Sequence, residues 1–228
     1  MNIRKYDIVS ILRDLIAEMI ITVKVSSSTD NGDGTFTLSS CNTQYLNDCT
    51  TFTVNGNLYT VLTIENDSIL TVQGSPVLTT DFNLRAPLFI PDTPKGANNE
   101  TVLRADDLDR NPFIWLLEDF RTEFVFDGGP NVSEPRLRLF FLNASENPTW
   151  LETQHRENCI EPMQNLCDRF IKELEYKISG KIERFTIINR LRFGNSSNNR
   201  SILDESLSGV ELDITIPVKK WAVKCKEC

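Results

Sequence analysis

The sequence SGVELDITIPV at residues 208–218 alternates between apolar and polar side chains. A period of two residues is typical of a β-strand with one face in a hydrophobic core. The stretch therefore predicts a strand with Val210, Leu212, Ile214, Ile216 and Val218 facing inward and with Glu211, Asp213 and Thr215 facing outward.

The segment before it, residues 181–193, alternates in the same way, with Phe185, Ile187, Leu191 and Phe193 on one face. We expect these two strands to pair across the polar loop 194–208. Such a pair would bring the arginines of the first strand into one sheet with Glu211 and Asp213, which helps to fix the register. The arginines concerned are Arg184, Arg190 and Arg192.

Residues 157–178 carry apolar side chains at spacings of three and four, which predicts an amphipathic helix that ends before Gly180. The stripe consists of Ile160, Met163, Leu166, Cys167, Phe170, Ile171, Leu174 and Ile178. Upstream, residues 136–142 and 113–126 read as strands, although Asn111-Pro112 could instead begin a short helix.

In the N-terminal part, the spacing of apolar residues changes from that of a helix to that of β-strands. Residues 2–21 predict a helix, and residues 26–34 (SSSTDNGDG) predict a loop. Short strand-like runs follow at 35–39, 51–54, 58–65 and 69–73, separated by turn sequences such as Asn55-Gly56-Asn57. The proline-rich stretch 87–96 reads as an extended connector. Residues 26–91 are thus expected to form a small antiparallel β-barrel or sandwich module.

Together these patterns predict an α+β protein: an antiparallel or mixed sheet packed with helices, plus the inserted β module. The helix in residues 1–25 belongs to the main domain, whose remainder is residues 92–228 with a C-terminal tail.

Charge and hydropathy exclude several classes of protein. The 228 residues include 24 Lys and Arg against 32 Asp and Glu, a net charge of −8, which argues against a general nucleic-acid-coating role. No apolar run approaches the ~20 residues that span a bilayer, and none resembles a signal peptide. We therefore expect no membrane association and no Sec export, which favours free thiols over disulfides for the six cysteines.

Residues with catalytic or metal-binding potential are few. The one histidine, His155, is expected to be a solvated residue at a helix start, and no catalytic or nucleotide-binding motif is present. Asp106, Asp107 and Asp109 could bind a hard cation but favour a solvated turn. Residues 30–34 favour a hairpin turn over a calcium loop, and Cys225-x-x-Cys228 favours a tail with free thiols over a zinc site. We therefore expect that the protein is not an enzyme and that it binds no metal and no cofactor.

The order helix, strand, strand, long helix, strand, strand resembles the tail-terminator and tail-completion proteins of bacteriophages. The segments that carry the resemblance are residues 6–20, PFIWLLEDF (112–120), RLRLFFL (136–142), NCIEPMQNLCDRFIKEL (158–174) and SGVELDITIPV (208–218). The β insertion departs from the usual compact subunit. A neck or tail ring protein of a short-tailed phage, such as a crAss-like phage, fits an elaborated subunit equally well.

The resemblance implies a structural virion protein of the neck or tail, made in the host cytoplasm, with residues 92–228 as the ring-forming domain. Copies of the chain would close a homomeric ring that contacts neighbouring neck, tail or portal-side proteins. DNA would pass through the ring without specific binding, which suits an acidic chain.

Four apolar residues are candidates for subunit or partner contacts: Ile202, Leu203 and Leu207 in the loop 194–208, and Trp221 near the C-terminus. Packing of the three loop residues against the protein's own sheet is the alternative. A competing function is an adhesin or tail-associated binding module that recognises a glycan or a host protein through residues 26–91.

Overall fold

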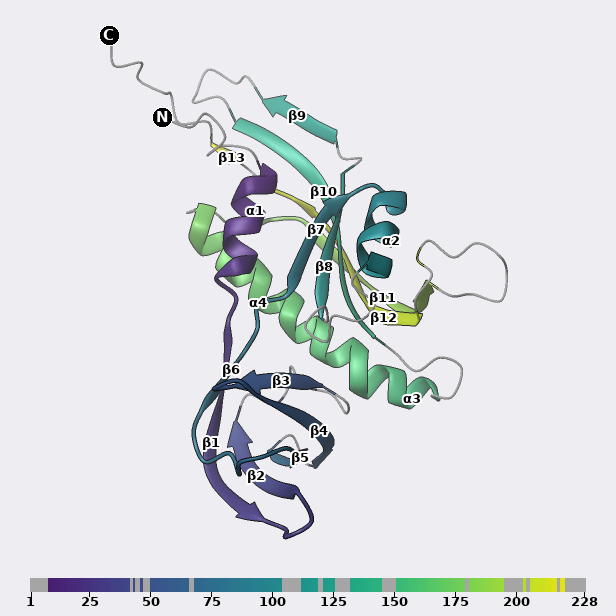
Figure 1. Cartoon of the computed structure of the whole chain (residues 1–228). Coiled ribbons are helices and arrows are strands. Elements are labelled where there is room, and N and C mark those ends of the chain that lie inside the picture. The colour runs from purple at the N-terminus through teal and green to yellow at the C-terminus, as the bar shows by residue number, and fades with distance from the viewer. Residues whose placement is uncertain are drawn as a thin grey trace.

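The structure is a computed structural model. It describes residues 8–41, 43, 46, 50–65, 68–103, 112–118, 121–125, 132–144, 151–178, 181–194, 203, 206–216 and 218–219. The chain is an α+β protein with two sheets, one of them nearly closed into a barrel. Figure 1 shows the small sheet as a separate lobe below the larger sheet and its helices.

The small sheet has the strand order β3-β4-β5-β2-β1-β6. Its strands are β1 (Ile21–Asp30), β2 (Thr35–Cys41), β3 (Thr51–Val54), β4 (Asn57–Glu65), β5 (Ile69–Gln73) and β6 (Phe82–Leu84). The terminal strands β3 and β6 contact each other, which nearly closes the barrel. The strands predicted between residues 35 and 73 are confirmed, as is the Asn55-Gly56 turn, where both residues have positive φ.

The loop predicted at residues 26–34 is wrong. Ser26 to Asp30 continue β1 and pair with β2, so that the hairpin turn spans only residues 31–34. The Asp30 and Asp33 carboxylates accept hydrogen bonds from the backbone N–H groups of Gly32 and Thr35, both at 2.9 Å. These are turn contacts within the hairpin, as the hairpin reading of residues 30–34 predicted.

The larger sheet has the order β11-β12-β10-β8-β7, and β9 and β13 pair with the N-terminal half of β10. Its strands are β7 (Leu88–Asp92), β8 (Phe113–Leu117), β9 (Arg121–Val125), β10 (Val132–Ala144), β11 (Phe185–Gly194), β12 (Ser206–Thr215) and β13 (Val218–Lys219). The pairing of β11 with β12 across the polar loop is confirmed, and so are strands rather than a helix at 113–125.

The connector predicted at 87–96 is also wrong. Leu88 to Asp92 form β7, which runs parallel to β8, and Pro94 begins α2 (Pro94–Leu103). The small sheet therefore takes up residues 21–84, whereas sequence analysis placed the module at 26–91. The short length of β7 and its proline conceal it from a pattern-based reading.

Helices cover both faces of the larger sheet (Figure 1). α1 (Ile8–Ala17) and α4 (Glu161–Ile178) pack on one face, and α2 packs on the other. α1 is shorter than the predicted helix, because β1 already begins at Ile21, and residues 1–7 lie outside the described part. The predicted helix 157–178 is confirmed and starts earlier, with α3 (Glu152–His155) and a π-helical turn (Arg156–Ile160) before α4.

One hydrophobic cluster joins the two lobes. It contains Leu12 and Met19 from the α1 region, Phe36 and Val72 from the small sheet, and Phe170 from α4, all at most 1% exposed. The core of the small lobe is therefore continuous with the core between α4 and the larger sheet. None of the helices in the described ranges is long and apolar enough to cross a membrane.

Candidate interaction surface

The strand β11 forms one end of the larger sheet. It pairs with β12 on one side, and no strand in the described part of the chain pairs with its other side. Such an edge presents a row of backbone N–H and C=O groups that a further strand can use.

The backbone bonds show which residues face this edge. The N–H of Thr215 donates to the carbonyl of Arg184, one residue beyond the Phe185–Ile214 pair that begins the β11–β12 register. In an antiparallel pair, alternate residues turn their backbone groups toward the partner strand. The backbone groups of Phe185, Ile187 and Asn189 therefore point toward the free edge.

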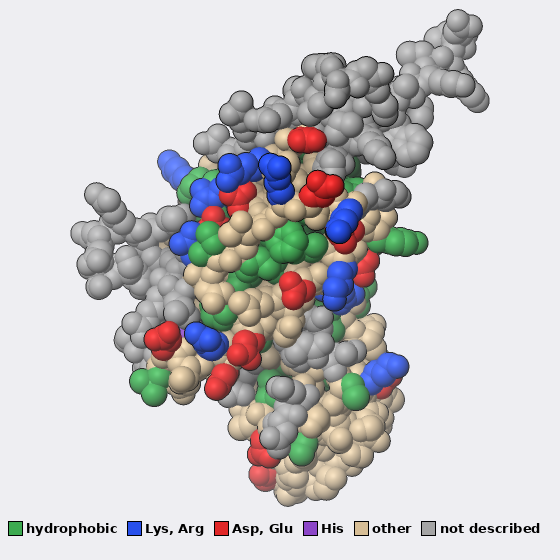
Figure 2. Space-filling model, turned by 180° about the vertical axis from the view of Figure 1, so that it is seen from behind, with side chains coloured by type: hydrophobic (Ala, Val, Ile, Leu, Met, Phe, Trp, Pro, Cys, Tyr) green, Lys and Arg blue, Asp and Glu red, His purple; other side chains and the backbone are tan. Residues whose placement is uncertain are grey.

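β11 also exposes apolar side chains on both of its faces. Phe185 is 47% exposed on the face toward α4, and Ile188 is 40% exposed on the opposite face. The sequence predicted Phe185 on one apolar face of the strand together with Ile187, and Phe185 is exposed on that face because no described strand covers the outer side of β11. Figure 2 shows hydrophobic side chains gathered in the middle of the upper lobe, with Lys, Arg, Asp and Glu side chains around them.

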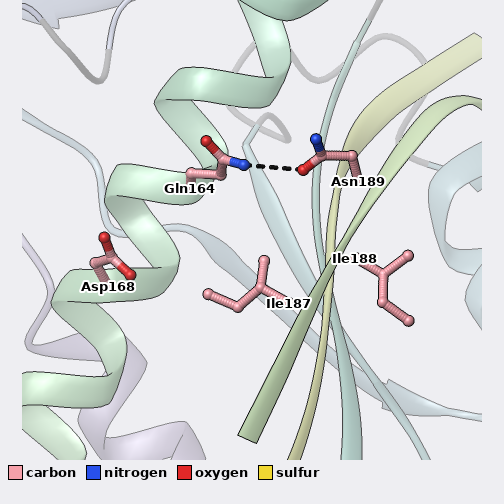
Figure 3. Close-up of a pocket in the computed structure, with 5 residues that line it drawn as sticks. All are labelled: Gln164, Asp168, Ile187, Ile188 and Asn189. Carbon is pink, nitrogen blue, oxygen red and sulfur yellow. Dashed lines mark hydrogen bonds between the residues drawn. The ribbon is translucent and has the colours of Figure 1, made fainter.

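A cleft of about 490 Å³ lies between α4 and β11. Figure 3 shows Ile187 pointing toward α4 and Ile188 pointing away from it. The side-chain amide of Gln164 on α4 donates a hydrogen bond of 2.9 Å to the Asn189 side chain, and Asp168 lies one helical turn further along α4. The cleft therefore places one apolar side chain, Ile187, among the polar side chains of Gln164, Asp168 and Asn189.

On the face of the sheet that points away from α4, one buried carboxylate accepts hydrogen bonds from two arginines. Glu211 on β12 is 3% exposed in its side chain and accepts hydrogen bonds from Arg138 at 2.8 and 2.6 Å. Its second oxygen accepts from Arg190 Nε at 2.7 Å and also from Arg190 Nη2. Glu211 faces the side that the alternation predicts, but this side is covered by the arginines, so the expectation of a solvent-exposed residue is wrong.

A second arginine–carboxylate pair lies beside the first. Arg136 donates to Asp213 at 3.0 and 2.6 Å, and this hydrogen bond lowers the pKa of Asp213. The pair therefore stabilises the fold above the usual pKa of an aspartate and loses its effect as pH falls through the lowered pKa. With three arginines for two carboxylates, this part of the sheet carries a net positive charge on an acidic protein.

The candidate contact residues from the sequence fall into two groups. Leu203 and Leu207 are 0% exposed and pack with Ile90, Trp115 and Phe140 in a second core cluster under α2. They are therefore core residues, as the alternative of packing against the protein's own sheet predicted, and they are not available for docking. Ile202 and Trp221 lie outside the described residues, as do Asp106, Asp107, Asp109, Cys225 and Cys228.

His155 is buried, at 1% exposure, so the expectation of a solvated residue is wrong. The π-helical turn continues the helix at this point, and the His155 Nδ1 atom lies 3.0 Å from Ser208 Oγ on β12. Within the described ranges, no group of three His, Cys, Asp or Glu residues is placed to hold a metal ion.

The described cysteines differ in their accessibility. Cys41 is exposed, whereas Cys159 and Cys167 are buried, and burial raises the pKa of the Cys159 thiol to about 12. Because the thiolate is the reactive form, we expect iodoacetamide at pH 8 to modify Cys41 well before Cys159 or Cys167 in the native protein. Peptide mass mapping over a time course measures this order. Equal rates for the three cysteines would contradict the burial of the two helix thiols.

The edge of β11 could not be found from the sequence, because strand order depends on contacts between distant segments. The available sequence signal was Ile188, an apolar residue next to Ile187 that places apolar side chains on both faces of the strand. Comparisons of this chain with protein-family models, with curated proteins and with solved structures found no match.

Proposed function

We propose that this chain is a structural virion protein that forms a homomeric ring in the neck or tail of a bacteriophage. Copies of the chain contact one another and the neighbouring neck, tail or portal-side proteins. DNA passes through the ring without specific binding. The larger lobe contains the N-terminal helix, the strands and the long helix that motivate this proposal in the sequence, together with β7 and α2, which the sequence did not predict.

The observation that carries the proposal is the open edge at β11. The exposed side chains of Phe185 and Ile188 contribute little to the stability of a monomer, and an open strand edge flanked by exposed apolar side chains favours association. The small lobe, in contrast, nearly closes its own sheet. The larger sheet is thus the part of the molecule that is suited to contacts between subunits.

The test is the mass of the purified full-length chain, measured by light scattering over a concentration series and followed by negative-stain imaging. We expect the mass to rise with concentration toward closed rings. A chain that remains monomeric up to its solubility limit, and that also fails to join rings in a mixture with its genomic neighbours, would contradict the proposal.

The adhesin alternative gains no support from the small lobe. The described aromatic side chains of its sheet, Phe36, Phe52, Tyr59 and Phe82, are all buried in its interior. Phe52 stacks on Tyr59 and Phe82, and Phe36 meets Tyr59 edge to face. A platform on which a sugar ring stacks would need exposed aromatic faces. These four side chains form a core and offer no such platform.

A further inference from the structure

We propose that the subunits associate by strand addition, in which β11 of one copy pairs with β9 of the next copy. This inference rests on the proposed function, because it names the contact that would build the ring. The free edges of β7, β11 and β9 in the larger sheet differ in proline content and charge, and these differences support the inference.

The edge of β7 is closed to a further strand. The backbone N–H of Leu88 donates to the carbonyl of Pro112, and the carbonyl of Asp92 accepts from the N–H of Glu118. The backbone groups of the even-numbered residues of β7 therefore point toward β8. The outward positions are therefore 87, 89 and 91, and two of them are prolines. Proline has no N–H to offer, and natural proteins use it to protect sheet edges. At the other end of the same sheet, β11 has no proline in residues 185–194.

Pairing of β11 with a second β11 brings like charges together. In an antiparallel pair centred on Ile187, Arg184 falls opposite Arg190 of the second copy. The stretch 181–194 holds four Lys and Arg residues and one glutamate, so shifted registers also place cations side by side. Like charges directly opposite each other destabilise a strand pair. The partner of β11 is therefore an acidic strand.

β9 meets this requirement. The stretch 118–127 (EDFRTEFVFD) holds four acidic residues and one arginine, alternates with aromatic residues and contains no proline. Within the described part of the chain, β9 pairs only with β10. In that register Glu123 lies opposite Glu134, a like-charge pair that a cation from a neighbouring strand would relieve.

The strand directions also agree. β10 is antiparallel to β9 and to β12, and β12 is antiparallel to β11, so β9 and β11 run in opposite directions. A rotation axis roughly parallel to the strands preserves these directions from copy to copy. It therefore joins β11 to the next β9 as an antiparallel pair. This contact uses two different surfaces, which is the arrangement that closes rings.

The test uses full-length variants and the concentration at which half of the chains are assembled. Ile187→Pro removes an outward N–H of β11, and we expect this concentration to rise by about tenfold or more. The matched control is Phe89→Pro, which removes the outward N–H of β7 from a side chain that is also partly buried against the main core. We expect the control to assemble like the wild type. Circular dichroism verifies that both variants are folded.

Charge reversal tests whether β9 is the strand that pairs with β11. Arg184→Glu and Glu123→Arg should each weaken assembly, and the double variant should recover most of it. Assembly that responds to neither reversal nor to Ile187→Pro overturns this inference and leaves the proposed function intact. Arg184→Glu that strengthens assembly, with no effect of Glu123→Arg, indicates β11–β11 pairing instead and also overturns it. A wild-type chain that associates neither alone nor in a mixture with its genomic neighbours overturns the proposed function itself.

Discussion

Gly209→Ala is expected to prevent stable folding or to lower the free energy of unfolding by about 3 kcal/mol or more. Gly209 lies in the middle of β12, opposite Leu142 of β10. A β-carbon there would overlap the Phe141 carbonyl oxygen and lie 3.0 Å from the Phe141 carbonyl carbon and 3.1 Å from Leu142 Cα. Overpacking costs about 1–3 kcal/mol where side chains can move, and here the obstacle is backbone at the centre of the sheet.

The measurement is urea denaturation followed by circular dichroism, with Gly32→Ala as the control. Gly32 has φ +80° and nothing within 4 Å of an added β-carbon, so its substitution costs only the conformational penalty of about 1–2 kcal/mol. Equal effects of the two substitutions would contradict the close approach of β12 to β10.

Glu211→Ala is expected to lower the free energy of unfolding by about 2–3 kcal/mol. Removing one partner of a fully buried ion pair costs about 3–5 kcal/mol, because a charge is left without compensation. The loss is smaller here because the side chains of Arg138 and Arg190 are 46% and 36% exposed and can regain contact with water. The two arginines would also repel each other once the carboxylate between them is absent.

Asp213→Ala is the matched control on the same strand and face. Its partner Arg136 is 68% exposed, and exposed pairs contribute about 0–1 kcal/mol. Urea denaturation at pH 7 should therefore separate the two variants clearly. A Glu211→Ala variant that is no less stable than Asp213→Ala would show that the shared carboxylate contributes no more than a surface pair.

Local patterns predicted most of the elements. Alternation identified β10, β11 and β12, and the apolar stripe identified α4. Short strands flanked by Asn-Gly turns predicted the small sheet. Patterns failed where a strand is short or carries proline: β6 has three residues, and Pro91 led to the reading of β7 as a connector. They also failed at Ser26 to Asp30, where turn-forming residue types continue a strand because β2 offers them backbone partners.

The site depended on information that no single segment contains. Leu203 resembles an exposed loop residue in the sequence, yet it packs in a buried cluster with Ala97 of α2 and Ile90 of β7. Glu211 alternates outward like Asp213, and only the approach of Arg138 from β10 and Arg190 from β11 makes it a buried residue. The open edge of β11 follows from strand order, which the alternation of one strand does not determine.

The hydrophobic cluster that joins the two lobes has a consequence for the history of the chain. Residues 21–84 have the appearance of a cassette inserted between α1 and β7, yet their buried side chains belong to the same hydrophobic cluster as Leu15, Ile16 and Met19, which are at most 2% exposed. The two lobes are therefore expected to melt together as one cooperative unit. A lineage that acquired the barrel would have had to fit its core to that of the larger lobe, and a later loss of the barrel would break this shared cluster.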